Sequence, residues 1–275
     1  MALAHLILLS LIQGITEFLP ISSSGHLILL PALMDWPDQG AFLDVAAHVG
    51  TLGAVLLYFR QDTVGLTLGG LATLGIPPAR KAVDGTPYRN LFVALVVATI
   101  PAVVVGYILK ETGVLDLLRD PAVIAGAFIG FGLLLLYADK TSPARKQMET
   151  VSMGTAIRMG LAQCFSLIPG ASRAGVTMTA ARALGYDRVS AARFSMLMSI
   201  PVIIASATLA LLDVLETGKA SLVDGAIVAV LSLLFALMAI RLLMGWLARA
   251  DMTLFVIYRV AFGMVLYGLI FADLL

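Results

Sequence analysis

Charged residues and cysteine are scarce in this sequence. Only 13% of the 275 residues are charged, the formal net charge is +1, and no run of Lys and Arg follows one face. The electrostatic footprint of a nucleic-acid-binding protein is absent, so we expect no nucleic-acid partner. Cys164 is the single cysteine, which excludes an internal disulfide and predicts packing rather than redox chemistry. Because the N-terminus lacks a basic region followed by a small-residue cleavage site, we expect residues 6–11 to belong to the mature protein.

Apolar residues, in contrast, are abundant. They make up 60% of the chain, and the mean hydropathy is +0.99, more than one soluble core needs. A membrane-spanning helix takes roughly 20 mostly apolar residues. Six stretches are predicted to span a bilayer, at residues 42–59, 91–109, 122–138, 194–212, 226–243 and 254–272. We therefore predict an all-α integral membrane protein in which residues 1–275 form a single membrane domain.

Two further segments are long enough to span but carry polar groups and helix breakers in the middle. Residues 6–31 read LILLSLIQGITEFLPISSSGHLILLP, and residues 159–184 read MGLAQCFSLIPGASRAGVTMTAARAL. A proline followed by small hydroxyl residues breaks a helix, and the backbone groups it frees cannot face lipid. We predict two re-entrant helix-loop-helix hairpins whose tips lie inside protein or a wet cavity. A kinked but complete span is the alternative.

The basic residues predict the topology. The loops at residues 60–89 and 139–158 each hold four Lys and Arg residues, which places both loops in the cytoplasm. The first hairpin then enters from the outer side and the second from the cytoplasmic side. A shift of 150 positions places Gln13 on Gln163, Thr16 on Ser166, Ser22 on Ser172 and Gly25 on Gly175. Biased composition can produce such matches by chance, but these fall on polar positions, which favours an inverted repeat of approximately residues 1–138 and 155–275.

Ionisable groups inside membrane segments are functional candidates, because burying a charge in lipid is costly. The hairpins hold Glu17, His26 and Arg173. A guanidinium matches phosphate oxygens, and an imidazole can act as nucleophile or transfer protons. The surrounding hydroxyls and backbone N–H groups could form an anion-binding nest, with candidates at Ser22, Ser23, Ser24, Gly170, Ser172 and Thr177. The alternatives are a structural ion pair between Glu17 and Arg173 and a core histidine at position 26.

These motifs carry a family resemblance. The strings QGITEFLPISSSGHLIL and IPGASRAGVTMTAARALG closely resemble the bacitracin-resistance type of undecaprenyl-diphosphate phosphatase. The stretches FLDVAAHVGTLGAVLLYF and AARFSMLMSIPVIIASA look like the same family, so the resemblance covers essentially the whole chain. It implies hydrolysis of the terminal phosphate of undecaprenyl diphosphate, which gives the monophosphate carrier for cell-envelope synthesis. It also implies a divalent cation, Mg²⁺ or Ca²⁺, and a bacterial inner-membrane location with a site open to the periplasmic face.

The resemblance also assigns roles to residues. The family's first motif has Glu or Gln and then Glu four residues on, which matches Gln13 and Glu17, so a metal would rely on Glu17, phosphate oxygens and water. The second motif matches Pro169 to Arg173, but Ala174 replaces a serine common in relatives, which puts an essential role of that hydroxyl in doubt. Asp44 and His48 match positions that are often polar, although capping or packing is the favoured interpretation.

A mechanism follows as a hypothesis. Glu17, Ser23, His26 and Arg173 are the predicted catalytic residues, and Gln13, Ser22, Ser24, Gly170, Ser172 and Thr177 are predicted to bind substrate. The nucleophile stays open among His26, a serine and water, and the polyprenyl tail is expected to leave sideways into membrane lipid. The rival function is a polyprenyl-phosphate flippase or transporter, because inverted repeats with broken helices occur in transporters. The oligomeric state is open, with a homodimer as one option.

Overall fold

The computed structural model describes residues 2–34, 40–217 and 221–274, and this part of the chain is helical and contains no β-strand. The α-helices are α1 (Leu3–Thr16), α2 (Ser23–Met34), α3 (Ala41–Tyr58), α4 (Arg60–Thr73), α5 (Pro77–Ala82), α6 (Tyr88–Glu111), α7 (Val114–Leu117), α8 (Pro121–Thr141), α9 (Met153–Gln163), α10 (Arg173–Ala183), α11 (Arg188–Thr217), α12 (Leu222–Leu247) and α13 (Thr253–Phe271). Two short 3-10 turns are η1 (Met148–Thr150) and η2 (Cys164–Leu167).

Six of the described helices are long and apolar enough to cross a membrane: α3, α6, α8, α11, α12 and α13. They coincide with the six spans predicted from hydropathy, which confirms that prediction. Their ends follow local chemistry. Pro121 opens α8, and the Asp120 side chain accepts from the backbone N of Ala122 at 2.8 Å, so a cap and a first-turn proline fix where this helix begins.

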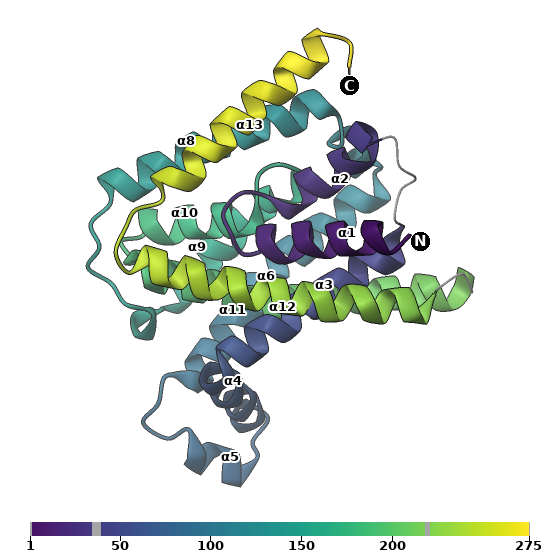
Figure 1. Ribbon diagram of the computed structural model, residues 1–275. Coiled ribbons are helices and arrows are strands. Elements are labelled where there is room, and N and C mark those ends of the chain that lie inside the picture. Colours follow the sequence, from purple (N-terminus) through teal and green to yellow (C-terminus); the bar gives the residue numbers. More distant parts are fainter. Residues whose placement is uncertain (1, 35–39, 218–220, 275) are drawn as a thin grey trace.

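The two predicted hairpins each contain a helix, a break and a second helix. In the first hairpin the chain follows α1, breaks over residues 17–22 and returns along α2 (Figure 1). In the second hairpin α9 and η2 lead to a break over residues 168–172, and α10 follows. We call these two stretches the first break and the second break. The insertion of the hairpins into the bilayer and the inverted repeat of the two halves stay predictions.

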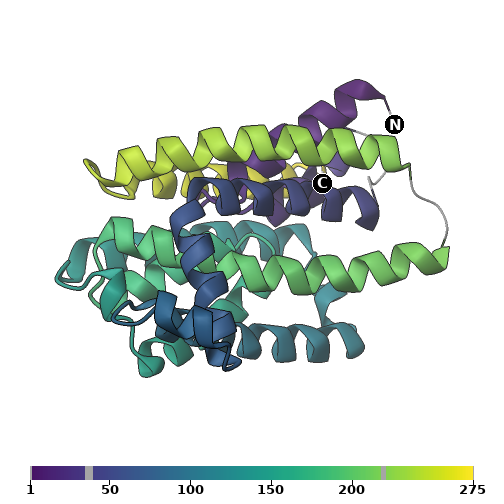
Figure 2. The ribbon, with the colours of Figure 1, turned by 90° about the horizontal axis from the view of Figure 1, so that it is seen from below.

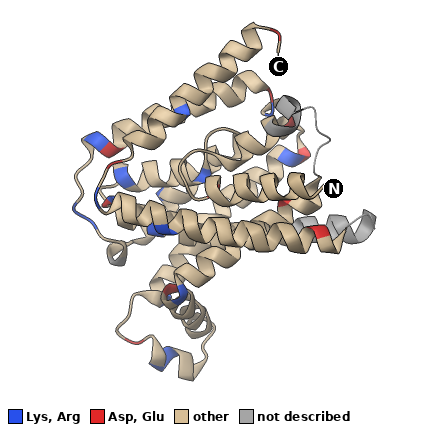
Figure 3. Cartoon of the chain, viewed as in Figure 1, with Lys and Arg blue, Asp and Glu red and all other residues tan. Residues whose placement is uncertain are grey.

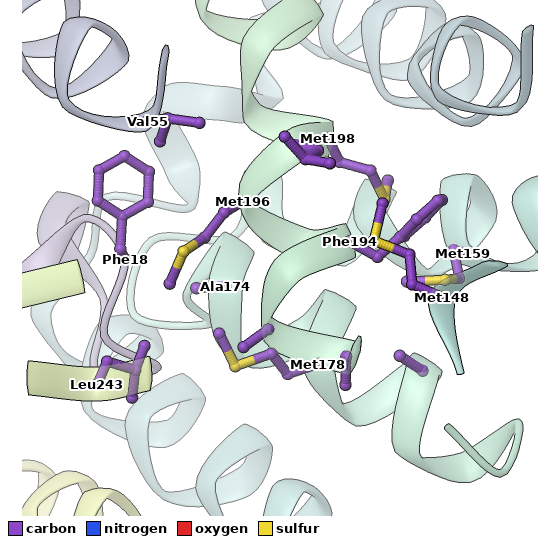
Figure 4. Packing of buried hydrophobic residues seen from close by; sticks show 14 of the residues in the cluster. Phe18, Val55, Met148, Met159, Ala174, Met178, Phe194, Met196, Met198 and Leu243 are labelled. Atoms are coloured by element: carbon purple, nitrogen blue, oxygen red, sulfur yellow. The ribbon is translucent and has the colours of Figure 1, made fainter. Parts of the chain in front are cut away.

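Helix α1 packs on α12 and α12 on α3, while α8 packs on α13 and this pair runs obliquely to α12 (Figures 1 and 2). The helices α4 and α5 project from one side of the bundle, below α12 in the view of Figure 1. The main core draws on both hairpins, because Phe18 of the first break and Ala174 of α10 join the same cluster as Met196 of α11 and Leu243 of α12 (Figure 4). Packing of this core therefore holds the two breaks near each other.

Charged side chains are sparse along the long helices (Figure 3). One of them, Asp139, is buried and has two arginine partners. Asp139 at the end of α8 is completely enclosed and accepts from Arg182 of α10 at 2.9 Å and from Arg188 of α11 at 2.8 Å. A buried carboxylate is tolerated only with such partners. This cluster joins α8, α10 and α11 at the end of the bundle where the basic loop of residues 139–158 lies.

Candidate functional site

A cavity of about 450 Å³ lies where the two breaks meet α3 and α11. Its polar wall holds Glu17, Ser22, Ser23 and Ser24 from the first hairpin, Asp44 and His48 from α3, Ser166, Ser172 and Arg173 from the second hairpin, and Ser206 from α11. Its apolar wall includes Val45, Leu167, Val202 and Ile203. The cavity thus combines one guanidinium, two carboxylates and several hydroxyls with a hydrophobic side.

Glu17 lies at the centre of the polar contacts. Its Oε1 accepts from Arg173 Nη2 at 3.0 Å, and its Oε2 accepts from Ser23 Oγ at 2.7 Å and from Gln13 Nε2 at 3.1 Å. His48 Nε2 lies 3.7 Å from Oε2. The side chain of Glu17 is only 7% exposed, so these donors replace the water that a carboxylate would otherwise bind. Gln13 reaches Glu17 because it is one helical turn earlier in α1.

Arg173 connects the second hairpin to this carboxylate. It is the first residue of α10, its side chain is 11% exposed, and its Nη1 donates to the carbonyl of Ser195 at 2.9 Å. The guanidinium also lies over the ring of Phe18, 5.9 Å from the centroid. These two hydrogen bonds fix the orientation of the guanidinium. Because Arg173 begins α10, the guanidinium also lies at a helix N-terminus, where negative charge is favoured.

The same capping turn starts the second helix of each hairpin. Ser22 has φ +73° and Ser172 has φ +68°, a left-handed conformation that is uncommon for residues other than glycine. Ser22 Oγ accepts from the backbone N of Gly25 at 3.4 Å, and Ser172 Oγ accepts from that of Gly175 at 3.0 Å. These are the serines that the 150-residue shift aligns. The breaks therefore share local geometry as well as sequence.

His26 of α2 is not among the residues that line the cavity. Its Nδ1 is 2.6 Å from the carbonyl oxygen of Ser22, which can only accept, so Nδ1 carries a proton. Its Nε2 is 2.6 Å from the hydroxyl of Tyr258, and the ring stacks on Phe262 with centroids 4.7 Å apart. Both ring nitrogens are engaged. The structure therefore places His26 as a group that orients the first break rather than one that faces the cavity.

Three other predicted residues act from behind the cavity wall. Thr177 is fully buried and bonds to Ser195 Oγ at 2.6 Å and to the carbonyl of Arg173 at 2.8 Å. Gly170 has φ +89°, and a Cβ there would meet the carbonyl of Ile124 at 2.5 Å, so the position requires glycine. Gln13 is buried, and its Nε2 donates to Glu17 Oε2 at 3.1 Å. These residues shape the site without lining it.

Several functional candidates were not identified, or were given little weight, by sequence reasoning. Asp44 and His48 line the cavity one turn apart on α3, although capping or packing was the favoured interpretation. Their spacing of four residues was a usable signal, because it places both on one helix face. Ser206 lies in an ordinary span and gives no signal. Arg259 lies within the predicted span 254–272, where a charge is itself a signal.

A preformed metal centre is not evident. In the described ranges no group of three or more His, Cys, Asp or Glu side chains is arranged to hold a metal ion. The cavity wall nevertheless offers the carboxylates of Glu17 and Asp44. Mg²⁺ commonly binds through one or two carboxylates together with phosphate oxygens and water, so this donor set fits a cation that arrives with a phosphate ligand.

The six apolar helices and the cavity define a multi-pass membrane protein whose polar site is built from two broken hairpins. The family described as bacitracin resistance protein BacA matches residues 6–265, and the chain belongs to this family.

The chain is 51% identical over 273 residues to a protein named undecaprenyl-diphosphatase from Ruegeria pomeroyi, covering 99% of this chain and 100% of that protein. It is 50% identical over 273 residues to a protein of the same name from a Jannaschia species, with the same coverage. For the one from Alteromonas mediterranea the identity is 45% over 276 residues, covering 99% and 100%. The family resemblance stated from the motifs is confirmed.

Proposed function

We propose that this chain is an undecaprenyl-diphosphatase, which hydrolyses undecaprenyl diphosphate to undecaprenyl phosphate and inorganic phosphate and so recycles the lipid carrier for cell-wall synthesis. One observation carries the proposal. Glu17 and Ser23 of the first hairpin meet Arg173 of the second hairpin in one cavity, within hydrogen-bond distance. A carboxylate, a hydroxyl and a guanidinium are the groups that phosphoryl transfer needs for proton removal, attack and charge neutralisation. The apolar wall of the same cavity suits the first part of a prenyl chain.

The geometry favours attack from the side of Ser23 and Glu17. In one route Ser23 Oγ forms a bond to the terminal phosphorus, the bridging P–O bond breaks, undecaprenyl phosphate leaves, and the hydroxyl proton passes to Glu17. Water then hydrolyses the phosphoserine. In the other route water attacks directly, and Glu17 takes its proton. The contact of 2.7 Å between Ser23 Oγ and Glu17 Oε2 supports both, because this carboxylate can accept a proton where the nucleophile lies.

Arg173 and the second break would hold the diphosphate. The guanidinium would neutralise the charge that builds on the phosphoryl oxygens, and the N-terminus of α10 would add the dipole of its free N–H groups. Negative charge at this position is already favoured in the structure, since Glu17 Oε1 occupies it at 3.0 Å from Nη2. When the substrate binds, Arg173 would therefore donate both to Glu17 and to a phosphate oxygen.

A divalent cation belongs to the proposal. Glu17 would hold it, with Asp44 as the second carboxylate on the cavity wall, and the cation would reduce the negative charge of the diphosphate. Glu17 Oε2 already has Ser23 and Gln13 as donors, so a bound cation would replace one of them. Activity should accordingly depend on Mg²⁺ or Ca²⁺ and stop when a chelator is added.

The cavity is proposed to open toward the outer face of the bacterial inner membrane. It is lined by residues 41–48 at the start of α3 and by residues 202–207 late in α11. The other ends of these helices adjoin the basic loops, near Arg60 and Arg188. If the basic loops are cytoplasmic, the cavity lies at the opposite, outer end. At the cytoplasmic end Arg193 Nε donates to Asp62 Oδ2 at 2.9 Å, which joins α11 to α4.

The test is release of inorganic phosphate from undecaprenyl diphosphate or farnesyl diphosphate by the purified protein in detergent, with Mg²⁺ or Ca²⁺ and then with chelator. Hydrolysis needs no bilayer, whereas a flippase has no measurable activity in detergent. Ser23→Ala is compared with Ser232→Ala, because Ser232 is a buried serine of α12 whose hydroxyl has no hydrogen-bond partner among the described residues. We expect metal-dependent release that Ser232→Ala keeps and Ser23→Ala reduces. No release from a folded parent protein would reject the enzyme and favour the flippase.

The same protein can decide between the two routes. Rapid quenching of the reaction with radiolabelled terminal phosphate should leave label on Ser23 if the serine attacks. If water attacks directly, no labelled protein forms and Ser23→Ala retains part of its activity through Glu17.

A further inference from the structure

The largest completely buried side chain among the described residues is that of Arg259 in α13. Its exposed fraction is 0%, and all its hydrogen bonds in the described part of the chain go to backbone carbonyls. Nε donates to Phe128 at 3.1 Å, Nη1 to Pro20 at 3.2 Å, and Nη2 to Ala127 at 3.2 Å, Gly170 at 3.0 Å and Ala171 at 2.9 Å. A guanidinium held by carbonyls alone is costly to bury, so its position calls for an explanation.

The explanation lies in which carbonyls it binds. Pro20 belongs to the first break, and Gly170 and Ala171 belong to the second break. Breaks in a helix free carbonyls that would otherwise accept from the next turn, and in an apolar interior each free carbonyl needs another donor. A guanidinium has five N–H donors in one plane, so a single side chain can satisfy both breaks and join them.

The second hairpin is shaped around this guanidinium. A Cβ at Gly175 would lie 2.5 Å from Arg259 Nη1, so any larger residue at position 175 would displace the guanidinium. A Cβ at Gly132 of α8 would lie 3.3 Å from the Cβ of Arg259. Arg259, more than 80 positions away in the sequence, therefore explains why residue 175 of the second motif is glycine.

We infer that Arg259 is a positioning residue for hydrolysis, which holds the first and second breaks at the separation that lets Glu17 meet Arg173. Pro20 is three residues from Glu17, and Ala171 is two residues from Arg173. Arg259 does not line the cavity and so does not touch the substrate. The inference rests on the proposed function and adds to it the element that aligns the two halves of the site.

A positioning role and a purely structural role predict different kinetics. If the guanidinium only stabilises the fold, its loss lowers the melting temperature, while the remaining folded protein keeps its kcat. If it aligns the breaks, folded protein loses kcat, because a displacement of about 1 Å in a catalytic group costs roughly 10²-fold. KM should rise as well, because Arg259 holds the second break, which is proposed to bind the diphosphate.

The experiment measures kcat, KM and the melting temperature in detergent for Arg259→Met, Arg259→Lys and Gly175→Ala. Arg259→Met should lose about 10²-fold in kcat, and Arg259→Lys less, because an ammonium reaches some of the same carbonyls but not both breaks at once. Gly175→Ala keeps Arg259 but displaces its guanidinium. A Cβ at position 175 would also lie 3.2 Å from the Cβ of Ser172, so Arg259→Lys, which leaves Ser172 untouched, is measured beside this variant.

Gly69→Ala is the control for stability. A Cβ at Gly69 of α4 would lie 2.6 Å from the carbonyl of Tyr88, so this variant should be destabilised without contact with either break. Its folded fraction should keep the parent kcat. Arg259→Lys and Gly175→Ala decide the question if Arg259→Met does not fold.

The inference is overturned if Arg259→Lys and Gly175→Ala both keep the parent kcat. It is also overturned if the activity of both falls only in proportion to their folded fraction, as expected for Gly69→Ala. A parent protein that releases no phosphate would instead reject the proposed function, so the two failures are distinguishable.

Discussion

Replacing Arg173 by lysine tests the phosphate-binding part of the site with little damage to the fold. Arg173 uses two nitrogens for two partners, with Nη2 3.0 Å from Glu17 Oε1 and Nη1 2.9 Å from the carbonyl of Ser195. Lysine keeps the positive charge but has one nitrogen, so it can pair with Glu17 or fix its own direction, but not both. Complete removal of the charge, as in Arg173→Met, would leave Glu17 buried without its ion pair and would cost about 3–5 kcal/mol of stability.

The expected effect on catalysis is larger than the effect on stability. Loss of one oriented donor to the developing phosphoryl charge costs about 10²–10³-fold in kcat, which corresponds to roughly 2.7–4 kcal/mol. The free energy of unfolding should fall by less, about 1–3 kcal/mol, because Glu17 still accepts from Ser23 and Gln13. Arg173→Lys should therefore be a folded protein with very low kcat.

The assay is steady-state phosphate release in detergent, with the melting temperature measured on the same preparation. Arg182→Lys is the matched control, because Arg182 lies on the same helix and pairs with buried Asp139 at 2.9 Å but does not line the cavity. It should be destabilised to a similar extent and keep most of its kcat. If Arg173→Lys keeps its kcat within about tenfold of the parent, the assigned electrostatic role is refuted.

Three further outcomes follow from the structure. His26→Gln should lose less than the roughly 10²-fold that a general acid or base contributes, because neither ring nitrogen faces the cavity; a larger loss in kcat would contradict this placement. Asp44→Asn should raise the Mg²⁺ concentration for half-maximal activity by about tenfold, and an unchanged metal titration would remove Asp44 from the cation site. Asp139→Asn should destabilise the protein by about 3–5 kcal/mol, since it leaves two arginines without their buried carboxylate; a melting temperature equal to that of the parent would contradict this.

Much of the fold could be predicted because a bilayer imposes simple constraints on sequence. The length and hydropathy of a span are set by the thickness of the membrane, so the six spanning helices were found. The helix breaks were predicted because Pro20 and Pro169 stand among small hydroxyl and glycine residues, and proline interrupts the hydrogen bonding of a helix. Glu17 and Arg173 were recognised as candidates because charges inside membrane segments are costly, whereas their direct ion pair was only the alternative interpretation.

Other parts of the site depend on helix rotation, which sequence does not reveal. His26 was grouped with the cavity because it follows the serines of the first break, yet α2 turns its ring toward Tyr258 and Phe262 of α13. Asp44 lies near the start of a span, where polar residues often act as caps, and its four-residue spacing from His48 places both on one helix face without showing that this face is turned to the cavity. Which face of α2 or α3 is turned to the site is decided by packing against helices far away in the chain.

The most direct test of one site built from two hairpins is a double-mutant cycle between Glu17→Gln and Arg173→Lys, with phosphate release as the readout. Groups that act as one unit are not additive, so removal of the second should cost little once the first is gone. We predict that the double variant is about as slow as the slower single variant. If the two losses in kcat multiply, as for independent groups, Glu17 and Arg173 do not work together and the central claim is contradicted.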